Sequence, residues 1–141
     1  MVNIQPSTQD QTQPNEIKLT QNGGVNEIPI SINNVLKIGV ILDSGAAEVS
    51  IAPDVALTFM RTGTIEKGDW LPGKVFTFAD GSKAESYRFL LKSVAIGNKK
   101  FNKVACSISS NVNAPMLLGQ NVLKQLGKYT IDNNKGVLQF D

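Results

Sequence analysis

Residues 38–46 read IGVILDSGA, an apolar run that ends in an aspartate, a serine and a glycine before an alanine. The apolar side chains of Val35–Leu42 predict a buried β-strand. Asp-Ser-Gly alone is ordinary turn chemistry, and most such matches are only turns. Here apolar residues stand on both sides of Asp43, whereas a solvated turn has no need of them. We therefore expect the strand to place this carboxylate in a fairly dry site.

The composition of the 141-residue chain limits the chemistry open to it. The sequence has no histidine and one cysteine, and its formal net charge is +2 at pH 7. Without histidine there is no Ser–His–Asp or Cys–His catalytic pair and no histidine-ligated metal, and a single cysteine forms neither an internal disulfide nor a zinc-binding cluster. The small net charge and the lack of a basic run give no sign of nucleic-acid binding. We expect no metal and no cofactor, and chemistry carried out by carboxylates, hydroxyls, amines and the backbone.

Length and composition predict one globular domain preceded by a polar arm. Hydrophobic residues make up 41% of the chain and charged residues 18%, which is typical of a globular protein. Residues 1–15 are rich in polar residues and proline, so we interpret them as a disordered arm or linker, and residues 16–141 as the folded domain. The longest apolar run, Ile38–Leu42, is far shorter than the ~20 residues of a membrane helix. No secretory signal pattern opens the chain, and the compartment stays undetermined because an anchor or signal could precede this sequence.

Alternating apolar residues separated by turn signals predict a mostly β structure. We expect three hairpins, with strands at 17–20 and 28–32, at 75–78 and 83–96, and at 129–131 and 137–140. Further strands are expected at 35–42, 101–108 and 116–119, and short helices at 53–60 and 120–126. Residues 61–73 contain several glycines and a proline, so we expect a loop there.

The order of these pieces resembles a retropepsin-like aspartic protease, in particular the single-lobe bacterial members. A strand ends in Asp-Ser-Gly-Ala at 43–46, a long hairpin with Asp80-Gly81 at its tip follows, and Leu117-Leu118-Gly119 precedes a short helix and a last hairpin. The resemblance covers about residues 16–141. It implies an all-β fold, a closed barrel with a flap hairpin and one or two short helices. It also implies the activity of an aspartic endopeptidase, a peptide hydrolase.

Hydrolysis of a peptide bond by carboxylates needs two of them. One group deprotonates the attacking water while the other protonates the scissile carbonyl or the leaving amine. Two carboxylates about 3 Å apart cannot both ionise, so they share one proton and divide these roles. Asp43 stands in the only Asp-Ser-Gly or Asp-Thr-Gly of the sequence. We therefore expect a homodimer in which the two Asp43 side chains meet at a two-fold axis.

The resemblance also implies roles for the residues around Asp43. Ser44 would hydrogen-bond across the pair of aspartates, and Gly45 would let the substrate backbone approach closely because it has no Cβ. An extended peptide or protein substrate would add to the site as a β-strand and be covered by the hairpin. The residues expected to contact it are Ala46, Glu48 and Leu117 in the cleft and Ala79, Asp80 and Gly81 at the tip of the hairpin.

Two positions depart from the pattern of the family. Many members have an acidic residue directly after Asp-Thr-Gly-Ala and an arginine directly after the apolar-apolar-Gly, where this chain has Ala47 and Gln120. Both members of that buried ion pair are missing together, so no unpaired charge is left behind. We interpret this as repacking around the active site, which leaves the dimer contacts near it open.

Two other functions stay open on the sequence alone. One is a catalytically silent peptide-binding or dimerisation module on the same fold, because a fold does not determine a function. The other is a β-barrel domain in which Asp-Ser-Gly is a plain turn. Two residues also have simpler interpretations: Glu48 as a surface carboxylate, and Cys106 as a core residue, since no histidine is there to activate its thiol.

Overall fold

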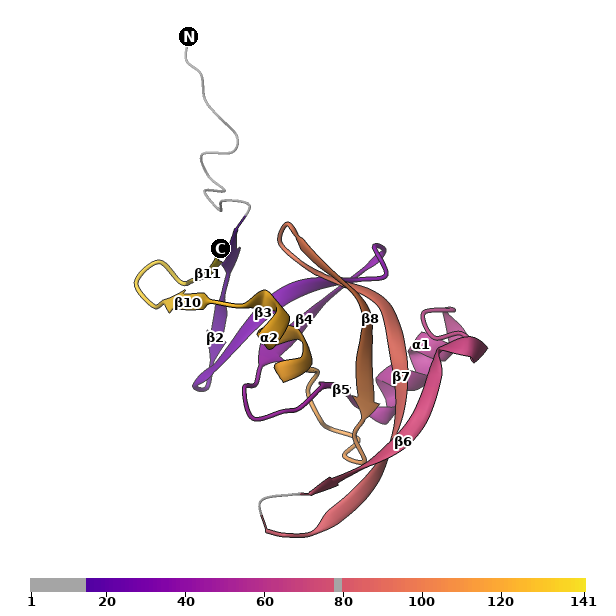
Figure 1. The fold of residues 1–141 in the computed structure, drawn as a ribbon. Coiled ribbons are helices and arrows are strands. Elements are labelled where there is room, and N and C mark those ends of the chain that lie inside the picture. Colours follow the sequence, from indigo (N-terminus) through magenta and orange to yellow (C-terminus); the bar gives the residue numbers. More distant parts are fainter. Residues whose placement is uncertain (1–14, 78–79) are drawn as a thin grey trace.

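The computed structural model describes residues 15–77 and 80–141, which form a closed barrel of β-strands, two α-helices and a small sheet at the chain ends (Figure 1). The predicted polar arm lies outside the described residues except for Asn15, and Ala79 lies outside them too. The expected all-β architecture with short helices is confirmed.

The barrel is one sheet that closes on itself. Its strand order is β2, β3, β4, β9, β5, β8, β7 and β6, and β3 also pairs with β7, which closes the ring. Most neighbours are antiparallel, but β4 runs parallel to β9 and β5 runs parallel to β8. The strands are β2 (Thr20–Asn22), β3 (Val25–Ile32), β4 (Leu36–Leu42), β5 (Val49–Ile51), β6 (Trp70–Thr77), β7 (Lys83–Ile96), β8 (Lys99–Ile108) and β9 (Leu117–Leu118).

A second, three-stranded sheet joins the two ends of the described chain. Strand β11 (Val137–Phe140) lies between β1 (Glu16–Lys18) and β10 (Tyr129–Asp132) and is antiparallel to both. The expected last hairpin is therefore confirmed. Because its outer strands are β1 and β10, each of these has one edge without a strand partner among the described residues.

The expected first hairpin is only partly correct. Strand β2 pairs with β3 around the Asn-Gly-Gly turn, as predicted. Ile17, however, lies opposite Leu138 of the last strand. The chain changes partners at Leu19, whose N–H donates to the carbonyl oxygen of Gly136 at 2.8 Å. A local alternation of apolar residues predicts a strand, but it does not indicate that the strand pairs with one from the far end of the chain.

Alternate side chains fill the barrel interior, as the sequence pattern predicts. Ile28, Ile30 and Ile32 of β3 are all buried, and Phe89 and Leu91 of β7 are fully buried in the same core cluster. Strand β4 differs from the expectation of a wholly buried strand, because only Val40 among its side chains is fully buried. The barrel wall is a single sheet whose outer face meets solvent, so a continuous apolar run is covered on one face only.

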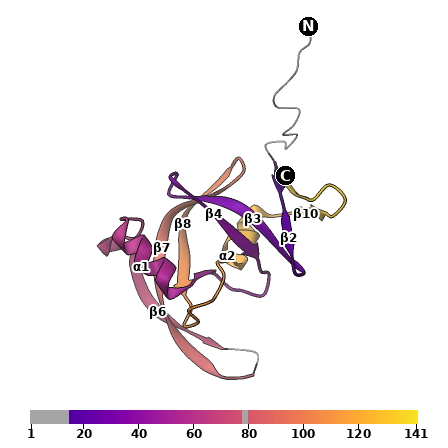
Figure 2. The same cartoon turned by 180° about the vertical axis from the view of Figure 1, so that it is seen from behind.

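The hairpin of β6 and β7 extends beyond the barrel, and Figure 2 shows the same extension from behind. Strand β7 pairs with β8 only from Arg88 onward, so residues 83–86 pair with β6 alone. Strand β6 begins at Trp70, which shortens the loop expected over 61–73. Pro72 and Gly73 lie at a shift of register in β6, where the N–H that proline lacks is not needed by the ladder.

Both predicted helices are confirmed. Helix α1 (Pro53–Arg61) begins with proline in its first turn and buries Ala56 and Phe59. Helix α2 (Gln120–Leu126) buries Val122, Leu123 and Leu126 and is followed by Gly127, whose φ is +79°. A 3-10 turn covers Lys67–Asp69. No helix in the described part of the chain is long and apolar enough to cross a membrane.

Substitution of Gly119 by alanine is expected to destabilise the fold. A Cβ at this position would lie 2.4 Å from the backbone oxygen of Glu48 and 2.8 Å from that of Ala46. These atoms move only with the chain, so we expect the free energy of unfolding to fall by about 1–3 kcal/mol. Gly68→Ala is the matched control, since nothing lies within 4 Å of a Cβ there. Denaturant unfolding measures both variants, and equal stabilities would contradict this close packing.

Candidate active site

Asp43 follows β4 directly and is held beside β9. The two strands run parallel, with Ile41 opposite Leu117 and Leu42 opposite Leu118. The hydrogen bonding continues past the end of β4, because the N–H of Asp43 donates to the carbonyl oxygen of Leu118 at 3.1 Å. The apolar strand therefore delivers the aspartate to a defined position, and Leu117, half-buried, lies close to it in the neighbouring strand.

The Asp-Ser-Gly turn is closed by its own aspartate. The N–H of Gly45 donates to Oδ1 of Asp43 at 2.9 Å, and the N–H of Ala46 donates to the backbone oxygen of Asp43 at 3.2 Å. Asp43 is half-buried, while Ser44 and Gly45 are exposed. The dry site expected from the sequence is therefore not complete within one chain, because the described residues leave this side of the turn uncovered.

The start of α2 holds the rest of the loop through neutral hydrogen bonds. The backbone N–H groups of Gln120 and Asn121 donate to the oxygens of Ala46 and Ala47 at 2.8 and 3.1 Å. Nε2 of Gln120 also donates to the backbone oxygen of Ser44 at 2.8 Å. The two positions that depart from the family pattern, Ala47 and Gln120, thus belong to one set of uncharged hydrogen bonds, in which Gln120 binds Ser44 and Ala46 while Ala47 binds Asn121.

Asn121 is a supporting residue that the sequence did not single out. Its Oδ1 accepts the N–H of Val49 at 3.1 Å, and its Nδ2 donates to the carbonyl oxygen of Ala105 at 2.8 Å. One side chain thereby ties α2 to β5 and β8 at the same time. The only signal in the sequence is an amide in the first turn of a helix, which is too common to indicate a role.

Glu48 is buried, with 7% of its surface exposed, and its carboxylate binds an arginine of the hairpin. Arg88 donates from Nε to both carboxylate oxygens at 3.1 and 3.0 Å and from Nη2 to Oε1 at 2.5 Å, and the hydroxyl of Ser107 donates to Oε2. The interpretation of Glu48 as a surface carboxylate is therefore wrong. Its contact with substrate stays a prediction.

The charge of Glu48 is maintained despite its burial. Burial disfavours the ionised carboxylate, but the hydrogen bonds from Arg88 and Ser107, together with the charges of Arg88 and Lys74, outweigh it and hold the pKa of Glu48 below its ordinary value. The hydrogen bond to Glu48 also raises the pKa of Arg88. The two side chains therefore form a charged pair with two-pronged geometry, which fixes angle as well as distance.

Asp80 and Gly81 lie at the exposed tip of the β6–β7 hairpin, as expected. Ser82 donates to Oδ1 of Asp80 from its hydroxyl at 2.6 Å and from its N–H at 2.9 Å, and these bonds lower the pKa of Asp80. Gly81 has a φ of +86°, a conformation that favours glycine. The tip is a tight polar turn on a different element from Asp43, at the end of the hairpin that extends past the β4–β5 loop (Figure 1).

Cys106 is a core residue, as expected. It is completely buried in β8. Burial, together with the nearby charge of Glu48, raises the pKa of its thiol well above the ordinary value. A neutral, inaccessible thiol is a poor nucleophile, so this side chain offers no alternative catalytic group.

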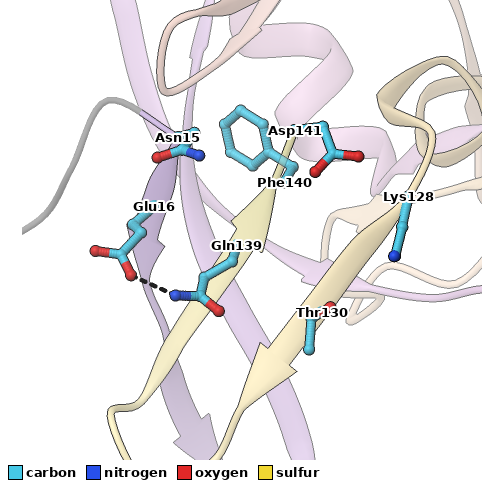
Figure 3. Close-up of a pocket in the computed structure, with 7 residues that line it drawn as sticks. All are labelled: Asn15, Glu16, Lys128, Thr130, Gln139, Phe140 and Asp141. Carbon is cyan, nitrogen blue, oxygen red and sulfur yellow. Dashed lines mark hydrogen bonds between the residues drawn. The ribbon is translucent and has the colours of Figure 1, made fainter.

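A polar pocket lies on the three-stranded sheet and contains no residue of the Asp43 loop (Figure 3). Nε2 of Gln139 donates to Oε2 of Glu16 across it at 2.6 Å. Its lining comes from the two ends of the described chain, namely Asn15, Glu16, Lys128, Thr130, Gln139, Phe140 and Asp141. The Asp43 loop and the pocket are therefore separate features of the molecule.

Comparison with known proteins agrees with this geometry. A family model described as "gag-polyprotein putative aspartyl protease" matches residues 28–125. Among solved structures, a retropepsin-like aspartic protease from Rickettsia conorii is similar, with a TM-score of 0.60 and 25% sequence identity over 89% of this chain and 90% of that chain. No curated protein matches. With most of its length matched by the family model and its barrel matched by a retropepsin-like structure, the chain belongs to the aspartyl protease family and has the retropepsin-like fold.

Proposed function

We propose that this chain is an aspartic endopeptidase, which hydrolyses peptide bonds in extended polypeptides with a water activated by Asp43 and by Asp43 of the partner subunit. One observation carries the proposal: Asp43 lies in an Asp-Ser-Gly turn at the end of β4, which β9 and α2 hold from two sides. Membership of an aspartyl protease family supports it.

The need for a second copy follows from the chemistry of the site. One chain contributes one such aspartate, whereas acid and base catalysis by a carboxyl pair requires two. Ser44 and Gly45 are exposed, so the turn is accessible to another copy of itself. A contact about a two-fold axis would bring the same loop from both chains together and exclude water from the carboxyl groups. This would complete the dry site that a single chain lacks.

The two Asp43 carboxyls would take different roles because they share one proton. The ionised one accepts a proton from water, whose oxygen attacks the scissile carbonyl carbon. The protonated one donates its proton to the carbonyl oxygen. When the tetrahedral intermediate collapses, the C–N bond breaks and a proton passes to the leaving nitrogen, so that a water is consumed for each bond cleaved. Ser44 would hydrogen-bond between the two loops and keep the carboxyls in place.

The substrate would lie as an added strand between the loop and the hairpin. Gly45 leaves room for its backbone, and Ala46 and Leu117 offer small and apolar contacts beside Asp43. Ala79, Asp80 and Gly81 would cover it when the hairpin closes. Glu48 is the remaining predicted contact, although its carboxylate is bound to Arg88.

Asp43→Asn is expected to abolish peptidase activity. The amide cannot accept the proton of water, so we expect the rate of cleavage of an unfolded protein at about pH 4–7 to fall at least about a hundredfold. Asp54→Asn is the matched control, because this exposed aspartate lies on α1 and its side chain makes no hydrogen bond that the structure shows. Equal cleavage by both variants would contradict the proposal. Absence of cleavage by the wild type would favour the silent binding module.

Mixing wild-type and Asp43→Asn chains tests whether the site is shared. The reference is wild type alone at the same total protein concentration. If subunits exchange freely and both aspartates are needed, an equal mixture should have about a quarter of the reference activity, because about a quarter of its dimers contain two wild-type chains. If each chain acts alone, the mixture should have about a half. The measurement is the initial rate over a series of mixing ratios after equilibration. A linear dependence on the wild-type fraction would rule out a shared pair of aspartates. Sedimentation of the same samples supplies the control that dimers are present.

A further inference from the structure

We infer that Glu48 and Arg88 are a positioning pair, which sets the β6–β7 hairpin relative to the loop that carries Asp43. The catalytic consequence of this inference rests on the proposed function, whereas its structural part does not. The pair would act through the two elements that it joins and not by touching the reacting atoms. We thereby assign a function to an ion pair that the proposed mechanism does not use.

Arg88 lies where the hairpin leaves the barrel. It is the first residue of β7 that pairs with β8, where Ser107 is opposite, and on its other side it faces Leu71 of β6. Beyond it, residues 83–86 pair with β6 alone. A two-stranded ribbon has little stability of its own, so its orientation depends on what holds its base.

The arginine contacts both strands of the hairpin as well as the loop. Its Nη1 donates to the carbonyl oxygen of Pro72 at 3.4 Å, next to the shift of register in β6. Its other two nitrogens bind Glu48. The guanidinium therefore joins β6, β7 and the loop at one point, and Ser107 adds β8 through the same carboxylate.

Glu48 is equally fixed at its own end. Gly119 packs so closely on it that a Cβ would lie 2.6 Å from its carbonyl carbon, and the hydrogen bonds from Gln120 and Asn121 hold the two residues before it. Because the backbone of Glu48 has little freedom to move, a displacement of its side chain would also displace the turn that holds Asp43. The loop and the base of the hairpin thus cannot move independently while the pair is intact.

Strand β7 also carries Lys92, whose exposed ion pairs contrast with the pair of Arg88 and Glu48. Lys92 of β7 binds Glu66 at 2.6 Å and Asp69 at 3.1 Å, but half of its side chain is exposed and its partners lie before β6, away from the Asp43 loop. Exposed ion pairs of this kind contribute little to stability. A buried ion pair is favourable only when its geometry is strict. Lys92 is therefore a control for the loss of charge on β7.

The pair should contribute to stability only above the acid range. The pKa of Glu48 lies below its ordinary value of 4.5, so its stabilising effect is complete above about pH 4.5 and is lost as the pH falls through the lowered pKa. The charges that act on Glu48 are those of Arg88 and Lys74, while the thiol of Cys106 stays neutral. Glu48→Gln should flatten the acid side of a plot of unfolding midpoint against pH. An unchanged acid side would show that the charge of Glu48 does not take part.

The decisive experiment uses the full chain with Glu48→Gln and Arg88→Met together. This double variant leaves no unpaired buried charge, so it should fold where Arg88→Met alone could fail. Amide hydrogen exchange is measured for residues 44–48 and 83–88, with Lys92→Met as the control. We expect both segments to exchange faster in the double variant and neither in the control. Arg88→Lys keeps the charge but loses the two-pronged contact, and should lie between wild type and the double variant.

Catalysis supplies the second measurement. If the hairpin is misplaced, kcat/KM should fall by about tenfold or more, mainly through a higher KM, while Lys92→Met matches the wild type. Unchanged exchange in both segments, or faster exchange in 83–88 alone, would overturn the inference. So would an effect of Glu48→Gln that is confined to substrates with basic side chains and leaves the exchange of both segments unchanged, because Glu48 would then act through contact with substrate alone. Faster exchange in both segments without any wild-type peptidase activity would instead refute the proposed function and leave the positioning pair supported.

Discussion

Parallel pairing of β4 with β9 is the constraint on which the rest of the site depends. Antiparallel neighbours are joined by short turns, whereas this pair needs most of the barrel to be built between its two strands. The pairing brings the end of β4 and the beginning of α2 to the same place, because α2 starts directly after β9. Asp43 is thus positioned by a contact that forms only when the barrel is complete.

The loop that follows β4 is held differently on its two sides. Toward α2 it meets backbone groups and amide side chains, whose hydrogen bonds satisfy the loop without placing a charge there. Toward the hairpin it meets the Glu48–Arg88 ion pair, whose two-pronged contact restricts both the angle and the distance between the two side chains. The neutral side suits a fixed support. The charged side suits a connection to the hairpin, which in the proposed function closes over the substrate, since the guanidinium defines the direction of the contact.

Several features were predictable because they depend on residues close together in the chain. The alternation over Ile28–Ile32 predicted which side chains fill the barrel, and helical spacing predicted α2 and its end at Gly127. Asp80-Gly81 predicted the tip of the hairpin, because few other residues adopt such a turn. The exposure of β4 was not predictable, since an apolar run does not reveal whether one face of a sheet or both will be covered.

By itself, the sequence determined the aspartate, the turn that presents it and the strand that leads to it, because turn chemistry and apolar periodicity act over a few residues. Only the tertiary structure decided that Ile17 pairs with the last strand and that Glu48 meets Arg88. A carboxylate in a sequence carries no mark of its counter-ion. The two charges face one another because closure of the barrel places β5, β8 and β7 side by side, and burial then makes their pairing obligatory.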